Sequence, residues 1–332
     1  MPMSTQPSIS QTAPIRTVAV LLTCFNRREL TLASLESLSQ QQGVQDLETT
    51  VYLVDDGCTD GTGDAVRTHF PQVKLLQGNG SLYWVGGMRL ALDTALKVGF
   101  DAYVWLNDDT ILYADALARL ATSANQWMAD AKPAIVAGSV CSPVTGHHTY
   151  GGFVRRSRGP ALYFDKLEPH PLVALPCDTM NGNFTLIPRI VAETIGNIEQ
   201  RFRQQFGDVD YGLRAGNAGF SIVLAPGYVG ECSENSLAGT WRDQRASFTK
   251  RWRQLVSPKG VPVAEWLLYT KRHYGWRWMH YAASPYIKTI VSSLRPSTLM
   301  RSVDTAEPAT ERIRSRPDNI FPQPTSERIS EQ

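Results

Sequence analysis

Three clusters of acidic side chains in this 332-residue sequence have the residue types and spacing that chemistry would need. Asp55-Asp56-Gly57 follows one apolar run directly, and Asn107-Asp108-Asp109 follows another. The third cluster, Gly207-Asp208-Val209-Asp210, opens a stretch with helical spacing of apolar residues. Carboxylates behind buried strands can accept hydrogen bonds from a nucleobase or a ribose, or bind a hard divalent cation. A third carboxylate that faced the same pocket could act as a general base.

Each cluster also has a purely structural interpretation. Asp and Gly favour turns and helix N-caps, and acidic residues in a first helical turn suit the helix dipole. For Asp55 alone, the structural interpretation is favoured. For the adjacent Asp108 and Asp109 the two interpretations are about even, because their mutual repulsion needs a compensating charge. The structural alternative there is a turn in which Asp109 or Thr110 caps a helix near Ala114.

The first half of the chain alternates short apolar runs with helical patterns. Strands are expected over 17–23, 51–54, 73–76 and 102–106, and helices over 28–42, 64–70 and 85–98. This alternation predicts an α/β fold with a mostly parallel central sheet and helices on both faces. Ligands bind such sheets at the carboxyl ends of the strands, where the first two acidic clusters fall.

The pattern changes after Ala137, since Gly, Pro and Thr punctuate residues 138–176 and indicate a less regular, partly antiparallel region. Later elements are expected as strands over 180–187 and 220–224, a helix over 209–218, and an aromatic, basic helical segment over 265–293 that is broken at Pro285.

The overall composition excludes several classes of protein. A hydrophobic fraction of 42% with a net charge of +2 excludes a disordered chain, although residues 1–15 and 301–332 read as a disordered lead and tail. No run approaches the roughly 20 apolar residues of a membrane-spanning helix. The five cysteines are widely spaced without a CxxC pair, which argues against a zinc or disulfide framework and favours a reducing cytoplasm.

Charge is concentrated in residues 241–301, which carry 12 Lys and Arg against Asp243 and Glu265, together with five of the eight tryptophans. One interpretation is a membrane-surface patch that meets anionic lipid or a lipid-linked diphosphate. The other is a packed helical appendage, slightly favoured because Pro262 and Pro285 interrupt any long amphipathic helix. The acidic first 240 residues, without a nucleic-acid motif, argue against a nucleic-acid partner.

Four segments together resemble the inverting glycosyltransferases of family 2, which have the Rossmann-like GT-A fold. The resemblance covers about residues 17–235. It implies a GT-A domain over 16–240 and a basic, aromatic helical appendage over 241–300. A further loop, residues 80–87, is similar to one in rhamnosyl- and galactofuranosyl-transferase relatives. The segments that carry the resemblance are Thr23-Cys24-Phe25-Asn26-Arg27, Val54 to Thr62, Leu106-Asn107-Asp108-Asp109, and Phe206 to Asp210 followed by Leu213-Arg214 and Gly219-Phe220.

The resemblance implies hexosyl or deoxyhexosyl transfer from a nucleoside-diphosphate sugar to a saccharide or lipid-linked acceptor, in cell-surface polysaccharide synthesis. Asp208 is the expected general base, and Asp109 the expected ligand of a divalent Mg or Mn ion. The enzyme is expected in the cytoplasm, with peripheral contact to the inner membrane through 241–301 as an open alternative. The donor-binding residues implied are Thr23, Cys24, Asn26, Arg27, Asp55, Asp56, Gly86, Gly87, Arg89, Asn107 and Asp108. Those implied on the acceptor side are Asn181, Asn183 and Asp210.

Two departures from the family pattern bear on the metal. Asn107 stands at the first position of the DXD motif, so one charge is missing. Cys232, beside Glu231, stands where many members have a metal-ligating His, and a thiolate is a soft ligand that suits Mg²⁺ poorly. A catalytically inactive nucleotide- or sugar-binding module therefore stays open as an alternative. A nucleotidyltransferase is disfavoured, because its glycine-rich, lysine-bearing loop is missing.

Overall fold

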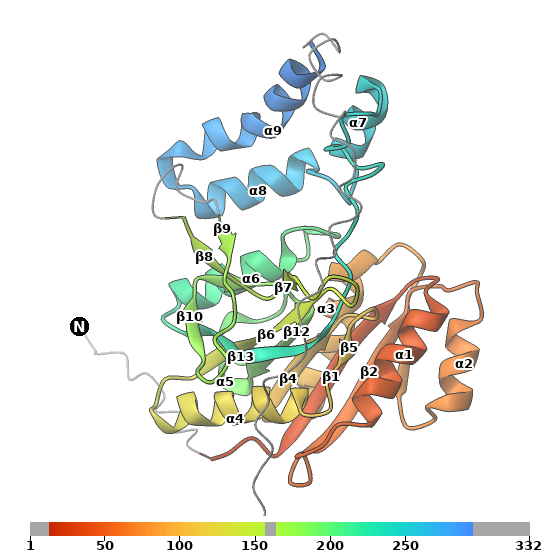
Figure 1. The fold of residues 1–332 in the computed structure, drawn as a ribbon, viewed down its shortest axis with the longest axis vertical. Coiled ribbons are helices and arrows are strands. Elements are labelled where there is room, and N and C mark those ends of the chain that lie inside the picture. Colours follow the sequence, from red (N-terminus) through yellow and green to blue (C-terminus); the bar gives the residue numbers. More distant parts are fainter. Residues whose placement is uncertain (1–12, 157–163, 295–332) are drawn as a thin grey trace, which may run out of the picture. The chain divides into compact units, whose positions relative to one another are not determined.

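The computed structural model describes residues 13–156 and 164–294. Its first half has the alternation of strands and helices that the sequence predicts, and the ribbon in Figure 1 follows it from red to orange. The elements are β1 (Thr17–Cys24), α1 (Arg28–Ser39), β2 (Glu48–Asp55), α2 (Thr62–His69), β3 (Lys74–Gln77), α3 (Tyr83–Val98) and β4 (Ala102–Leu106).

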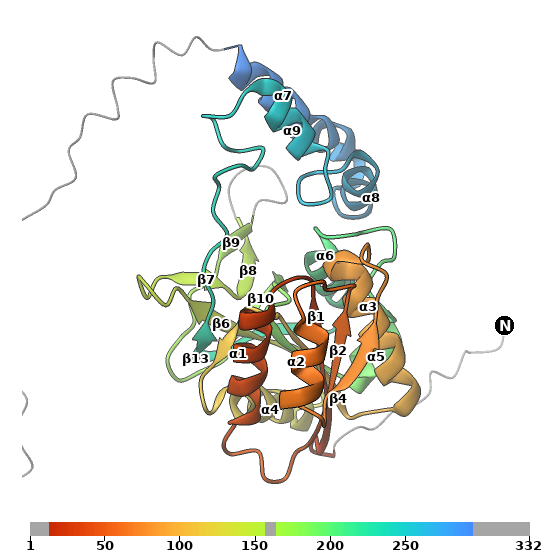
Figure 2. The ribbon, with the colours of Figure 1, turned by 90° about the vertical axis from the view of Figure 1, so that its right-hand side faces the viewer.

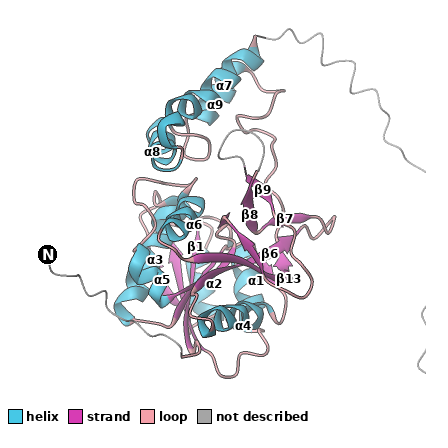
Figure 3. Cartoon of the chain, turned by 90° about the vertical axis from the view of Figure 1, so that its left-hand side faces the viewer, coloured by secondary structure: helices cyan, strands magenta, loops and turns pink. Residues whose placement is uncertain are grey.

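The second half is more mixed, as expected. A short β5 (Ile111–Leu112) and α4 (Ala116–Ala129) precede the long buried strand β6 (Ala134–Cys141). Three further strands, β8 (Gly152–Arg155), β9 (Phe164–Lys166) and β11 (Thr179–Met180), form a small antiparallel sheet (Figure 3). The remaining elements are β7 (His148–Tyr150), β10 (Leu175–Cys177), β12 (Phe184–Pro188), α5 (Arg189–Ile195), α6 (Gly207–Asn217) and β13 (Ser221–Glu231).

The main sheet has the strand order β10-β13-β6-β12-β4-β1-β2-β3. Its longest ladders, β1 with β2 and β13 with β6, are parallel, whereas β12 runs antiparallel to both of its neighbours. Alternate β1 side chains enter two separate cores. Val20 and Leu22 pack with helices α1, α2 and α4, and Leu21 packs with α3, α5 and α6 on the other face (Figures 1 and 2). The α/β sheet with helices on both faces is therefore confirmed.

Two predicted boundaries are wrong in this region. The strand expected over 180–187 is two strands, β11 and β12, separated by a turn at residues 181–183. The helix expected near Ala114 begins at Ala116, and β5 intervenes, so neither Asp109 nor Thr110 caps it. The turn matters for function, because it lets the backbone between two buried strands reach the pocket described below.

The C-terminal region contains α7 (Phe248–Leu255), α8 (Val263–His273), a single turn at Gly275–Arg277, and α9 (Trp278–Ser293). The break expected at Pro285 instead falls before α9, and Pro285 lies inside that helix. A proline cannot donate to the carbonyl four residues earlier. Here the Trp266 Nε1–H bonds the carbonyl of that residue, Tyr281, at 3.1 Å, and so satisfies the acceptor.

Among the residues that the structure describes, no helix has the length and apolar character needed to cross a membrane. Residues 1–12 and the tail over 301–332 lie outside the described residues. Ile15, expected in the disordered lead, is buried, and its amide donates to Asn125 Oδ1 at 2.9 Å.

Helix α3 approaches the end of β1 very closely at Gly87. A Cβ atom built there would overlap the Oγ1 and Cβ atoms of Thr23. This glycine therefore permits contact between a helix and a strand, whereas the sequence suggested close approach to a donor. The contact fixes α3 against the edge of the sheet where the acidic clusters gather.

We expect Gly87→Ala to lower the free energy of unfolding by about 1–3 kcal/mol, because the added methyl group must push α3 away from β1. Urea denaturation measures this loss. Gly216→Ala in α6 is the matched control, since its Cβ would make only an ordinary contact with Ile222 at 3.5 Å. The control should be neutral or should stabilise by up to about 1 kcal/mol, and equal losses in both variants would contradict the argument.

Candidate active site

The carboxyl ends of β1, β2 and β4 lie side by side at one edge of the sheet. The parallel register pairs Cys24 with Asp55 and Leu21 with Trp105. The loops that follow these strands therefore start at the same level, and they hold most of the predicted donor-binding residues. The structure brings together two acidic clusters that are about 50 residues apart in the sequence.

The loops after β1 and β2 are joined by side-chain hydrogen bonds. Asn26, with a positive φ of 52°, accepts the Thr59 amide on Oδ1 at 2.7 Å. Asp55 accepts the Cys58 amide on Oδ1 at 2.7 Å, and a side chain at Gly63 would collide with its other oxygen. The Asp55 carboxylate is thus fixed at the start of α2, with lone pairs left over for a further donor.

Asp56 supports the scaffold. Its Oδ1 accepts the Gly80 amide at 2.9 Å, and its Oδ2 accepts the amides of Leu82 and Tyr83 at 2.9 and 3.1 Å. The side chain is buried, so both oxygens are committed to the loop that leads into α3. The sequence predicts Asp56 among the donor-binding residues. In the structure, however, both of its oxygens accept hydrogen bonds from backbone amides.

The motif after β4 forms a small ion cluster with the β1 loop. Arg27 Nη1 lies 3.1 Å from Asp108 Oδ1 and 2.7 Å from Asp109 Oδ2. Burial raises the pKa of Asp108 to about 6, against the opposing charge of Arg27. Arg27 thus offsets the repulsion that the sequence predicts between these carboxylates.

The cysteine at the expected histidine position does contact this cluster. Cys232 Sγ lies 3.6 Å from Asp109 Oδ1. Burial, reinforced by the charge of Asp109, raises the pKa of the Cys232 thiol to about 12, so the group is protonated at neutral pH. Glu231 bonds Tyr113 instead, at 3.3 Å. In this structure Cys232 is therefore a buried, protonated neighbour of Asp109.

A divalent cation could bind beside Asp108 and Asp109 only together with further ligands. No group of three or more His, Cys, Asp or Glu side chains among the described residues could hold a metal alone. Mg²⁺ in nucleotide sites, however, is bound by one or two carboxylates together with the substrate's phosphates. Asp108 and Asp109 supply two carboxylates side by side, so the residues present fit a cation that arrives with a diphosphate.

Asn107, at the first position of the DXD motif, makes a structural hydrogen bond. Its Oδ1 accepts the indole N–H of Trp84 at 2.8 Å. Trp84 also packs edge to face on Trp105, with ring centroids 5.8 Å apart. The amide thus holds an aromatic ring at the wall of the neighbouring pocket, which explains why an uncharged residue can stand at this position.

That pocket, with a volume of about 410 Å³, contains the predicted base. Asp208 Oδ2 accepts the Gly182 amide at 3.0 Å, and Oδ1 accepts the Val209 amide at 2.8 Å. Burial raises the pKa of Asp208, although these hydrogen bonds partly offset the rise. Beside it, the buried Oδ1 of Asn181 has no hydrogen-bond partner. The lining residues are Trp84, Asn107, Tyr150, Phe164, Asn181, Gly182, Gln204, Gln205, Phe206, Asp208, Val209, Asn235, Trp266, Tyr269 and Tyr274.

Sequence reasoning missed the aromatic wall of this pocket. Trp266 and Tyr269 of α8 stack at 5.5 Å and 16°, and Tyr269 stacks on Phe206 at 5.2 Å and 28°. Tyr274 follows the same helix. Residues of the 241–301 segment, for which the sequence allowed two interpretations, therefore line the site. The clustering of aromatic residues in 241–301 was the available signal, but nothing local indicated which face they meet.

Asp210, two residues after the base, points elsewhere. Its side chain is fully buried, 2.9 Å from Arg214 and 2.8 Å from both Arg272 and His273. Burial by itself raises the pKa of Asp210, but the hydrogen bonds from His273 and Arg272 outweigh it and lower the pKa. The acceptor-side role suggested for Asp210 is therefore not supported, since the group locks α6 to α8.

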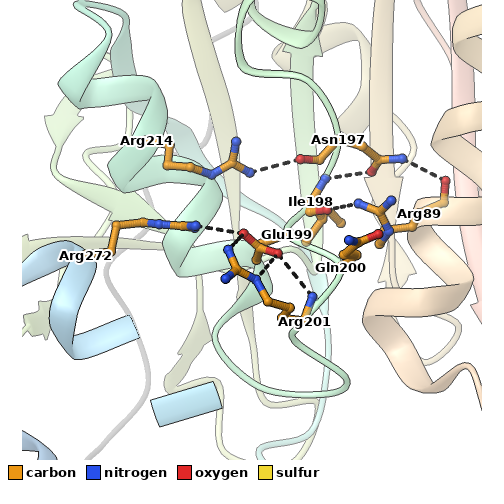
Figure 4. Close-up of a pocket in the computed structure, with 8 residues that line it drawn as sticks. All are labelled: Arg89, Asn197, Ile198, Glu199, Gln200, Arg201, Arg214 and Arg272. Atoms are coloured by element: carbon orange, nitrogen blue, oxygen red, sulfur yellow. Dashed lines mark hydrogen bonds and ion pairs between the residues drawn. The ribbon is translucent and has the colours of Figure 1, made fainter. Parts of the chain in front are cut away.

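Two further predicted residues lie outside the pocket. Arg89 donates to the carbonyl of Ile198 and lines a separate cavity of about 560 Å³ (Figure 4). The neighbouring arginines there bond carboxylates and carbonyls, among them Glu199, which Arg272 reaches at 2.7 Å. Asn183 is buried behind the site, where its carbonyl accepts the Asn107 amide at 2.9 Å. The structure thus places neither Arg89 nor Asn183 in the pocket.

Comparisons with known proteins agree with this geometry. Residues 19–178 match the family model described as Glycosyl transferase family 2. Proteins named N-acetylglucosaminyl-diphospho-decaprenol L-rhamnosyltransferase from two strains of Mycobacterium tuberculosis are 24% identical, over 78% of this chain and 85% of theirs. A mannosyltransferase from Pyrobaculum calidifontis, solved with GDP-Man and Mn2+, is 16% identical with a TM-score of 0.50. That alignment covers 90% of this chain and 77% of the other.

The fold is that of the GT-A glycosyltransferases, with the site at the strand ends. The match to the glycosyl transferase family 2 model over residues 19–178, together with the named relatives, identifies a glycosyltransferase. These matches support sugar transfer rather than the nucleotidyltransferase alternative, which the sequence already disfavours.

We expect Asp210→Asn to lower the free energy of unfolding by about 3–5 kcal/mol, because it leaves buried cations without their counter-charge. Chemical denaturation measures this loss. Asp64→Asn is the matched control, because Asp64 pairs with Arg67 at 2.7 Å on the surface, where 89% of its side chain is exposed. The control should change stability by no more than about 1 kcal/mol. A small effect of Asp210→Asn would show that the buried cluster does not hold α8.

Proposed function

We propose that this glycosyltransferase works by inversion, and that it moves a sugar from a nucleoside-diphosphate sugar to a saccharide or lipid-linked acceptor. The observation that carries the proposal is Asp208, a half-buried carboxylate of raised pKa in a pocket beside the strand ends. The hydrogen bonds that it accepts come from the amides of Gly182 and Val209. These neutral donors leave it basic enough to take a proton.

The nucleotide lies over the ends of β1 and β2 in this proposal. The free lone pairs of Asp55 accept hydrogen bonds from the base. The end of β1 and the loop after it, Thr23 to Arg27, contact the nucleotide. Arg27, with 43% of its side chain exposed, donates to the diphosphate next to Asp108 and Asp109. A divalent cation held by these two carboxylates would neutralise charge on the departing diphosphate.

The acceptor occupies the pocket that Asp208 lines. Its attacking hydroxyl gives the proton to Asp208 while the oxygen bonds the anomeric carbon. The bond from that carbon to the diphosphate breaks on the opposite side, and the diphosphate leaves with the electron pair. One displacement from the far side inverts the configuration at carbon. Oδ1 of Asn181, buried without a partner, accepts a hydrogen bond from a neighbouring hydroxyl of the substrate.

The aromatic wall selects for carbohydrate. The half-buried rings of Trp84 and Trp266, the second backed by Tyr269, pack against the C–H groups of a sugar ring, while polar side chains at the rim bind its hydroxyls. Since curated relatives are named for L-rhamnosyl transfer to a diphospho-decaprenol acceptor, we propose a hexosyl or deoxyhexosyl donor and a lipid-diphosphate acceptor. Cell-surface polysaccharide synthesis is the corresponding process. The five free cysteines fit a reducing cytoplasm.

Asp208→Asn should lower the rate of sugar transfer by about 10²–10⁴-fold, because the amide keeps the shape of the side chain but cannot take the proton. Donor affinity, measured by calorimetry, should not change. For the wild type, the acid limb of the pH profile of kcat/KM should lie above the ordinary Asp pKa, because activity is lost as pH falls through the raised pKa of Asp208.

Asp178→Asn serves as the matched control, since Asp178 is half exposed and bonds the Arg155 amide outside the pocket. It should keep wild-type turnover. Near-normal turnover of Asp208→Asn would exclude Asp208 as the base.

Asp109→Asn should weaken the gain in nucleoside diphosphate affinity that Mn²⁺ provides. The loss should be at least the roughly tenfold that follows removal of an outer-shell partner. Titration of the diphosphate with and without Mn²⁺ measures it. Asp115→Asn, which breaks a surface pair with Arg119, is the control and should bind as the wild type does. An undiminished Mn²⁺ effect in Asp109→Asn would remove this residue from the metal site.

A further inference from the structure

The turn before α9 and the helix itself carry an exposed apolar stripe. Trp276 is 80% exposed, Met279 61%, Ile287 54% and Ile290 41%. Residues three, seven, eight or eleven positions apart lie near one face of a helix, so Met279, Ile287 and Ile290 share a face of α9, and Trp276 lies in the single turn just before it. An exposed row of large apolar side chains on a soluble surface marks an interaction site more often than chance exposure does.

The opposite face of α9 already has its partners. Ala282 and Thr289 are buried. The Tyr286 hydroxyl donates to the carbonyl of Val261 at 2.8 Å, and the Tyr281 carbonyl accepts Trp266 at 3.1 Å. The helix therefore packs on the α8 region by one face. The stripe lies on the part of α9 that this packing leaves exposed.

The charge around the stripe is of one sign. Between Glu265 and Asp304 the sequence contains no acidic residue. Lys271 and Arg277 are exposed, and each lies over a tryptophan ring, Lys271 over Trp278 at 4.8 Å and Arg277 over Trp276 at 5.3 Å. Tryptophan rings beside basic side chains are typical of surfaces that lie at the headgroup level of a bilayer.

We propose that this stripe, Trp276, Met279, Ile287 and Ile290, is a docking surface for an anionic lipid bilayer. The apolar side chains enter the boundary between headgroups and acyl chains, and Lys271 and Arg277 meet the lipid phosphates. Charge complementarity argues for a bilayer rather than a second copy, because two copies would bring like charges together. The inference goes beyond the proposed function and does not depend on it, since binding needs neither donor nor acceptor.

Flotation of the full chain with phosphatidylcholine vesicles, with and without phosphatidylglycerol, tests the proposal. The wild type should bind the phosphatidylglycerol vesicles at low salt and lose binding as salt rises, because exposed charges are screened beyond roughly 10 Å at 0.1 M. Ile287→Asp should reduce partitioning by about tenfold or more, because it removes an apolar anchor. The double variant Lys271→Gln with Arg277→Gln should reduce it by about fivefold per charge.

Leu172→Asp is the matched control, since Leu172 is 82% exposed but lies between β9 and β10, away from α9. It should bind vesicles as the wild type does. Absence of binding at low salt, or equal binding of Ile287→Asp and the wild type, would overturn the proposal. So would a dimer in solution that Ile287→Asp dissociates, because a second copy would then cover the stripe. Nucleotide release in detergent-free buffer reports separately on the catalytic proposal.

Discussion

The buried carboxylate of Asp210 is the constraint on which the site depends. It lies within 2.9 Å of Arg214 on its own helix and of Arg272 and His273 on α8. A buried charge without partners is very costly, so α8 must be in place for α6 to keep this residue ionised. The same helix turn presents Asp208 to the pocket, and α8 supplies the pocket's aromatic wall. One ion cluster therefore sets the distance between the base and the ring surfaces that face it.

The acidic motifs divide between chemistry and support. Asp208 lines the pocket and Asp109 is partly exposed beside Arg27, whereas both oxygens of Asp56 accept backbone amides. Asn107 holds Trp84. Adjacent residues in one motif can take different tasks because successive side chains leave a strand end in different directions. Sequence motifs thus locate the site, while the contacts of each residue decide what it does there.

The parallel half of the sheet could be predicted because its signals are local. Each buried strand is an apolar run, and each acidic cluster follows its strand directly. The turn at residues 181–183 and the position of Pro285 inside α9 could not be predicted, because both depend on partners far along the chain. The pocket wall is the clearest case, since Trp84 and Tyr269 are far apart in sequence and meet only after the sheet has formed. Arg89 was misplaced because helical spacing does not show which side of α3 meets the donor loops.

The proline within α9 has a mechanical consequence. Because Pro285 cannot donate, the Tyr281 carbonyl is available to the indole of Trp266, whose ring also lines the pocket. Neighbouring helix axes lie about 8–10 Å apart. Two packed helices, α8 and α9, thus separate the outer stripe of α9 from the pocket that Asp208 lines. If the stripe docks on a bilayer as proposed, the thickness of these two helices sets the distance that a lipid-linked acceptor would have to span to reach the pocket.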